Sequence, residues 1–188
     1  MTSFARLQDA TPGDWAEIER VESRLQEARN AGYGLLRLLR DQRGDDTDGW
    51  PVNVYDHCLQ AATRAHQAGE TDEIVFCALF HDATEVIAPH DHGAAAALLL
   101  SPYISNEHRW LVEHHGEFQN RFAHNHPFRD RTAFEKYRGH PAFELTMRFC
   151  ERYDENSFDR SFAAMPLEAF EPLVDRICRS KGVRVGGA

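Results

Sequence analysis

Histidine and aspartate residues recur in this sequence where apolar helical stretches end. His81 and Asp82 are adjacent, follow the apolar run Ala78-Leu79-Phe80, and precede Glu85 by a few residues. Burying an imidazole and a carboxylate is costly unless each finds a partner. We therefore expect this pair to be hydrogen-bonded, to cap a helix or to bind a metal ion.

Other candidate ligands occupy similar positions. His57 lies in an apolar stretch, His92 opens one, and His115 and Asp154 each end one. Imidazole and carboxylate groups are ligands that iron, manganese and zinc accept, and the two oxygens of a carboxylate can bridge two ions. A lone histidine on an apolar face is more often a hydrogen-bonded core residue. The ordered set, in contrast, favours a metal centre.

Helices are the elements that would position these residues. Apolar residues recur at helical spacing, and no stretch shows sustained two-residue alternation, so the sequence predicts an all-α fold. Thr11 is expected to cap the first helix, with Pro12 at its first position and Asp14 at its third. The predicted helices are residues 11–30, a short helix ending at 39, 52–68, 72–86, 92–100, 106–117, 132–138, 142–154 and 167–179.

The predicted organisation is a single domain of 188 residues. Residues 1–50 form an N-terminal helical hairpin and a polar loop packed on the core, residues 51–181 form the helical bundle, and residues 182–188 form a frayed tail. The hairpin is interpreted either as a lid or as simple packing.

Composition argues against several classes of partner. The net charge of -9 and the pI near 5.6 provide no basic field for nucleic acid, and every apolar run is too short to span a bilayer. Four cysteines without a CxxC pair, and an N-terminus without a signal core, predict a reduced cytoplasmic protein. We expect a monomer or a small homo-oligomer.

The order His57, His81-Asp82, His92, His115, Asp154 resembles the HD-domain superfamily. In that superfamily a His…His-Asp…Asp series holds one metal ion, and two further histidines add a second. Residues 52–177 resemble more closely the predicted HD phosphohydrolases that include the mixed-valence diiron oxygenases of organophosphonate breakdown, with myo-inositol oxygenase a distant relative. The stretches that carry this likeness are 54–62, 88–93, 112–119, 138–141, 153–159 and 166–172.

The resemblance implies two iron ions, as an Fe(II)/Fe(III) pair. One would be held by His57, His81, Asp82 and Asp154, and the other by His92, His115 and the second oxygen of Asp82. His115 is expected to be the ligand rather than His114, because successive helix residues point about 100° apart and the spacing of His115 from Val112 and Gln119 fits the family. The implied reaction uses O2 to cleave a C–P or C–C bond of a small hydroxylated anionic substrate, with Gln119 and Glu85 at the catalytic centre.

Two departures from the oxygenase pattern support an alternative. The phosphonate oxygenases carry a tyrosine and a glutamate shortly before the first histidine, where this sequence has Thr47 and Trp50. They also favour a histidine at the position of Glu85, and His-Asp-Ala-Thr-Glu resembles mononuclear HD 5′-nucleotidases. The alternative is a phosphohydrolase with one divalent metal, such as Mn, Co or Fe, and Glu85 as its acid or base. A non-catalytic binding module is a third reading.

Contacts to an anionic substrate are expected from a basic segment near residue 130, because guanidinium groups pair well with phosphate or phosphonate oxygens. A solvated loop and helix face is the other interpretation of such a segment. His140 is a candidate for a substrate-facing wall or for a turn residue, and Ser157 for a head-group contact or a helix cap. The candidates are Arg129, Arg131, Arg138, His140 and Ser157.

Overall fold

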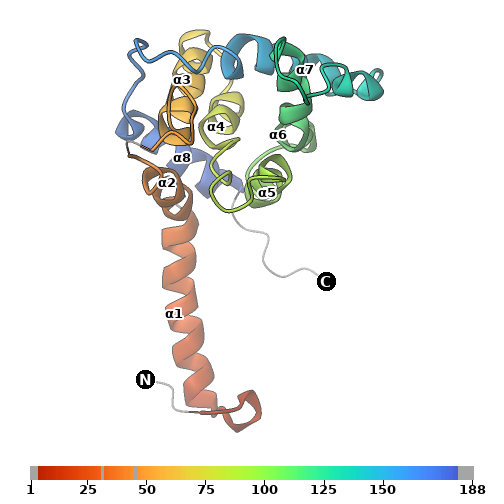
Figure 1. Ribbon diagram of the computed structural model, residues 1–188. Helices are drawn as coiled ribbons and strands as arrows, with labels where there is room; N and C mark the ends of the chain where they lie inside the picture. Colours follow the sequence, from red (N-terminus) through yellow and green to blue (C-terminus); the bar gives the residue numbers. More distant parts are fainter. Residues whose placement is uncertain (1–3, 31, 45, 182–188) are drawn as a thin grey trace.

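The computed structural model describes residues 4–30, 32–44 and 46–181, and its regular elements in these ranges are all helical. The all-α prediction is thereby confirmed. Figure 1 shows a bundle of helices from which α1 projects. The α-helices are α1 (Pro12–Asn30), α2 (Tyr33–Arg40), α3 (Val54–Gln67), α4 (Asp72–Phe80), α5 (His92–Leu100), α6 (Asn106–Gln119), α7 (Phe143–Phe149) and α8 (Leu167–Lys181). The shorter elements are η1 (Leu7–Asp9), η2 (Asn120–Phe122), η3 (Ala133–Tyr137) and η4 (Cys150–Asp154).

The bundle is built around α4, in which every residue from Ile74 to Phe80 is buried. A helix that is apolar on all sides must be surrounded by other elements, and α3, α6 and α8 all pack against α4. Because α4 ends inside the core, the residues that follow it, His81 and Asp82, are also buried.

The prediction that the helix continues to residue 86 is wrong beyond Phe80. The N–H groups of Ala83, Glu85 and Ile87 each donate to a carbonyl three residues back, which gives turns rather than an α-helix. The Nδ1 atom of His81 lies 3.0 Å from the Ala78 carbonyl in the last turn of α4.

Two further predicted helices are corrected in the second half of the chain. The segment expected at 132–138 is the 3₁₀ helix η3. The segment expected at 142–154 divides into α7 and the π-helical turn η4, where the Glu155 N–H donates to the Cys150 carbonyl five residues back. A π turn inserts one extra residue into a helix and often occurs at a functional site.

At the N-terminal end of the chain, α2 packs on the bundle through its buried residues Leu35, Leu36 and Leu39, whereas α1 projects away from it (Figure 1). The predicted cap of α1 is confirmed, since the Thr11 hydroxyl accepts a hydrogen bond from the Asp14 N–H and donates to the Asp14 carboxylate. The described side chains of α1 include none that is buried. The predicted tail, 182–188, lies outside the described residues. Within the described ranges, no helix has both the length and the apolar character needed to cross a membrane.

Candidate metal centre

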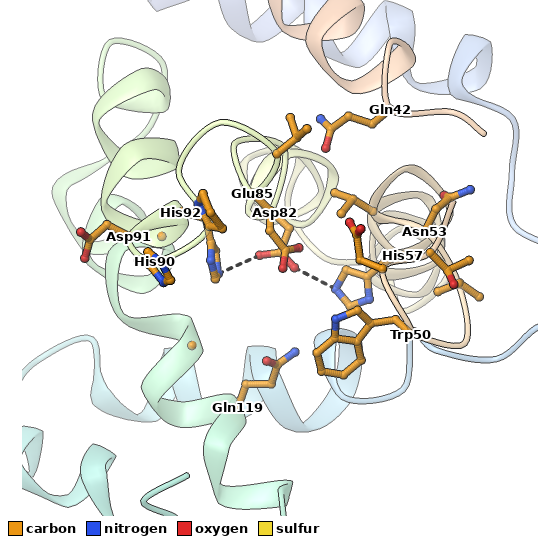
Figure 2. Close-up of a pocket in the computed structure, with 18 of the residues that line it drawn as sticks. Gln42, Trp50, Asn53, His57, Asp82, Glu85, His90, Asp91, His92 and Gln119 are labelled. Atoms are coloured by element: carbon orange, nitrogen blue, oxygen red, sulfur yellow. Dashed lines mark ion pairs between the residues drawn. The ribbon is translucent and has the colours of Figure 1, made fainter. Parts of the chain in front are cut away.

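The carboxylate of Asp82 lies between two groups of histidines. Its Oδ2 atom is 3.4 Å from His57 Nε2 and 3.5 Å from His81 Nε2, whereas its Oδ1 atom is 2.9 Å from His115 Nε2 and 3.3 Å from His92 Nε2. Figure 2 shows Asp82 between His57 and His92, which face it from opposite sides. Each oxygen therefore belongs to a separate set of nitrogen donors.

We call the first set the first half-site: His57, His81, Asp82 Oδ2 and Asp154 Oδ1. The Oδ1 atom of Asp154 is 3.2 Å from His57 Nε2 and 3.7 Å from His81 Nε2. His57 projects from the first turns of α3, a helix capped by Asn53, whose side chain accepts from the Asp56 N–H. Asp154 ends the π turn η4. The four side chains are buried.

We call the second set the second half-site: His92, His115 and Asp82 Oδ1. His92 is the first residue of α5 and His115 lies in the last turns of α6, and their Nε2 atoms are 3.3 Å apart. The close approach of the two helices depends on Gly93, because a Cβ atom there would lie 2.8 Å from the Glu113 carbonyl oxygen. The side chain of His92 is 25% exposed, so this half-site is partly open.

Three of the four histidines, His57, His81 and His115, are oriented by backbone carbonyls. The Nδ1 atom of His57 lies 3.0 Å from the Ser157 oxygen, that of His81 lies 3.0 Å from the Ala78 oxygen, and that of His115 lies 2.7 Å from the Val112 oxygen. A carbonyl can only accept, so each Nδ1 carries a proton and each Nε2 atom points to the centre, where its lone pair can bind either a proton or a metal ion. This second contact of a ring nitrogen is typical of metal-binding histidines.

The converging lone pairs need a cation between them. The Nε2 atoms of His57 and His81 are 3.2 Å apart, and two acceptors at that distance repel unless a proton or a metal ion lies between them. The donor spacings of 2.9 to 3.7 Å in both half-sites suit metal–ligand bonds of about 2.0–2.2 Å. The Oδ2 atom of Asp154 is buried without a hydrogen-bond partner. These residues could therefore hold metal, and the donor chemistry fits iron, zinc or manganese.

Without a metal, the same atoms bind protons strongly. Burial alone would lower the pKa of His81, but the carboxylates of Asp82 and Asp154 outweigh it and raise the pKa to about 9. Burial would raise the pKa values of both aspartates, and the surrounding histidines nevertheless hold them below the ordinary range. The cluster is thus a strongly stabilised arrangement of opposite charges.

A cavity of about 1460 Å³ opens in front of the two half-sites, and His57, Asp82 and His92 contribute to its wall. Much of the rest of the wall comes from residues 85–94 and from α6. Two loops contribute further residues: 41–44 and 46–53, which include Arg43 and Trp50, and 120–130, through Asn120 and residues 128–130. The Trp50 ring stacks on Phe158 with a centroid distance of 5.3 Å, and Phe158 packs against His57. Neither loop carries a candidate metal ligand.

Two predicted catalytic residues lie in this cavity. Glu85 lines it and is about half buried, and burial together with the nearby charge of Asp82 raises its carboxyl pKa. Gln119 also lines it and donates from Nε2 to Asp154 Oδ1 over 2.7 Å. Because residues 81–87 form turns, Glu85 does not lie one helical turn beyond His81 as the continued helix would require.

Of the five predicted substrate contacts, only Arg129 lines the cavity and only Ser157 contacts the candidate metal-binding cluster. Arg129 lines the cavity and lies over the Trp50 ring, 5.7 Å from its centroid. Ser157 is buried, and its carbonyl orients His57. The other three, Arg131, Arg138 and His140, are exposed and lie outside the described lining of the cavity. Arg131 donates to the Arg121 carbonyl, Arg138 pairs with Glu135, and His140 stacks on Trp110.

His114 and His115 point in different directions. His115 is buried beside Asp82, whereas His114 Nδ1 contacts the Tyr137 hydroxyl at 3.0 Å and packs on Trp110. The structure thus brings the expected member of the pair into the cluster.

Sequence reasoning overlooked two residues that shape the centre. Gly93 permits the contact between α5 and α6, and a glycine directly after a candidate ligand is a usable signal of such a close approach. Arg43 is one of two arginines that line the cavity, and apart from the histidines the other ionisable residues of its wall are acidic. The acidic residues of that wall are Asp41, Asp46, Asp48, Asp82, Glu85, Asp91, Glu113, Glu117 and Asp130.

Comparison with known proteins supports one family. Residues 54–156 match the family model of the HD domain, a range that contains all six candidate ligands. No curated protein sequence matches the chain.

Proposed function

Because this match covers more than half of its length, the chain belongs to the HD-domain family, and we propose that it is a mixed-valence diiron oxygenase. The proposed reaction uses O2 to cleave a C–P or C–C bond in a small hydroxylated anionic substrate. The observation that carries the proposal is the position of Asp82, whose two oxygens face two different sets of histidines. A single-ion site would not require the second set.

The composition of the second half-site favours an oxygenase. Two histidines and one carboxylate that leave coordination positions open are the donor set of many non-haem iron oxygenases. The partial exposure of His92 and its place in the cavity wall leave room for a ligand there. When bound, the iron pair would supply the redox chemistry and the activation of O2.

The residues around the cavity would bind and orient the substrate. Trp50 and Phe158 shield the His57 side of the centre with apolar surface. Arg43 and Arg129 are positioned to attract an anionic group, although the acidic wall weakens their field. The metal charge would then supply much of the attraction for an anion. The Glu85 carboxyl lines the same cavity, where burial and the charge of Asp82 raise its pKa, and it can contact a substrate there.

A phosphohydrolase is the second candidate function. Such an enzyme would need the first half-site alone, with Glu85 as general acid or base. The observation in its favour is that Glu85 lies in the cavity close to Asp82 and has a raised carboxyl pKa, the direction of shift expected for a general acid.

Metal analysis of anaerobically purified protein, together with EPR spectroscopy, tests the proposal. The parent protein should contain two iron ions per chain and give the signal of an antiferromagnetically coupled Fe(II)/Fe(III) pair. His92→Ala should retain about one ion, because loss of a ligand removes much of a site's affinity. His114→Ala is the matched control and should retain both ions, since His114 faces Tyr137.

Turnover assays then separate the two candidate functions. The parent should consume hydroxylated phosphonates only in the presence of O2. In the metal analysis described above, two ions bound to His92→Ala would contradict the assignment of His92 as a ligand. Hydrolysis of nucleoside monophosphates that needs no O2 and is supported by Mn or Co would contradict the oxygenase proposal.

A further inference from the structure

Gln119 joins the two half-sites through one helix. It is the last residue of α6 and lies one turn beyond His115, which faces the second half-site. Its Nε2 atom donates to Asp154 Oδ1, which belongs to the first half-site, over 2.7 Å. In Figure 2 the Gln119 side chain reaches from its helix toward the space between His92 and His57.

The hydrogen bond determines how Asp154 presents its carboxylate. Asp154 is fully buried, and its Oδ1 atom is the one that faces His57 at 3.2 Å. The carboxylate can only accept, so the amide nitrogen of Gln119 must point toward it. The Oδ2 atom has no hydrogen-bond partner. Without the amide, the carboxylate could rotate about its terminal torsion, which has broad minima.

We propose that Gln119 is a positioning residue that orients Asp154 for the first metal ion and couples the affinities of the two half-sites through α6. The inference rests on the proposed two-metal centre. A metal ion held by His115 fixes the last turns of α6, and those turns fix the Gln119 amide. An ion in the second half-site therefore strengthens the first, and the converse must hold, because coupling between two binding sites is reciprocal.

Metal titration of the apoprotein tests the positioning role without any assay of turnover. Gln119→Met keeps the length of the side chain and removes the donor. The affinity of the first half-site for Co²⁺, followed by its visible absorption spectrum, should fall about 10- to 100-fold, as is usual when the hydrogen-bond partner of a ligand is lost. The spectrum itself should also change, because the orientation of Asp154 changes.

Gln60→Met is the matched control, because the Gln60 amide also makes a partly buried hydrogen bond, to the Asp159 carbonyl. This control should lower the melting temperature of the apoprotein but leave the Co²⁺ affinity and spectrum unchanged. Gln119→Glu is a second variant, which keeps the shape of the side chain and places one carboxylate against another. It should weaken the first half-site at least as much as Gln119→Met does. Unchanged affinity and spectrum in both Gln119 variants would overturn the positioning role.

The coupling is tested by combining Gln119→Met with His92→Ala. In the parent background, His92→Ala should lower the affinity of the first half-site about 5-fold or more, a typical size for coupled sites. In the Gln119→Met background the same change should have little further effect. Equal effects in both backgrounds would show that any coupling passes through another route, such as the shared Asp82, and no effect in either background would show that the half-sites are independent; either result would overturn the coupling through Gln119. Failure of the two-metal proposal is distinguishable, because the parent would then bind a single ion.

Discussion

Substitution of Gly93 by alanine should disable the second half-site selectively. A Cβ atom at this position would lie 2.8 Å from the Glu113 oxygen and 3.0 Å from the Val112 oxygen, whereas ordinary contacts begin at 3.4 Å. Both neighbours are backbone atoms of α6 and cannot rotate away. We therefore expect α5 and α6 to separate by about 0.5 Å, the shortfall in these two contacts.

That displacement affects both histidines of the half-site. His92 is the residue before Gly93, and the Val112 carbonyl that would be displaced is the one that orients His115. Metal–ligand distances tolerate deviations of about 0.2 Å, so a movement of about 0.5 Å should cost about 10-fold or more in affinity. The first half-site, whose ligands lie on other elements, should keep its ion, with its affinity lowered only by the coupling through Gln119 proposed above.

The cost in stability should be modest. Overpacking typically costs about 1–3 kcal/mol, and replacing a helical glycine by alanine returns up to about 1 kcal/mol. The free energy of unfolding of the apoprotein should therefore fall by about 0–2 kcal/mol, which corresponds to a few degrees in melting temperature for a chain of this length.

Metal content after gel filtration, with thermal unfolding of the apoprotein, measures both effects. Gly116→Ala is the matched control, because Gly116 adjoins His115 on α6 yet a Cβ atom there meets nothing within 4 Å. That variant should bind two ions, and Gly93→Ala about one. Two ions bound with parental affinity in Gly93→Ala would refute the argument that helix contact at Gly93 positions His92.

Three further outcomes are expected. Asp82→Asn removes the charge that faces both half-sites and should abolish binding of both ions in metal analysis; one ion of full affinity would identify Asp82 as a terminal ligand. Glu85→Gln should leave both irons in place and mainly weaken substrate binding in an oxygenase, whereas in a hydrolase it should slow turnover about 10²- to 10⁴-fold; steady-state assays with and without O2 distinguish these results. In the metal-free protein the pKa of His81 is raised to about 9 from 6.5, so its stabilising effect is complete below pH 6.5 and is lost as the pH rises through 9. The melting temperature of EDTA-treated protein should fall across this range while that of metal-loaded protein does not, because the metal replaces the proton; a flat profile for the metal-free form would contradict the assigned electrostatics.

Patterns within single helices made much of the fold predictable. On α6 the buried residues Leu111, Val112, His115 and Phe118 share one face, and this spacing distinguishes His115 from His114. The start of a helix can also be predicted from its capping residue, as Thr11 at the start of α1 shows. The metal-binding roles stay predictions, but the structure brings all six candidate side chains to one place.

Features that depend on packing in three dimensions were not predictable. The apolar pattern does not mark Phe80 as the last residue of α4. The π turn before Asp154 likewise has no sequence signature, because the extra residue is accommodated by packing. The hydrogen bond from Gln119 to Asp154 joins residues 35 positions apart and becomes visible only in three dimensions.

The loops that line the cavity have a consequence for how such a protein diversifies. Residues 41–53 and 120–130 shape the entrance but supply no candidate ligand, while the ligands lie on α3, α5, α6, η4 and the turn after α4. Surface loops accept substitutions and insertions far more readily than packed helices do. Mutations in these two loops could therefore redirect selectivity toward new compounds while the reactive centre is inherited unchanged, so that closely related chains would share one chemistry and differ in what they consume.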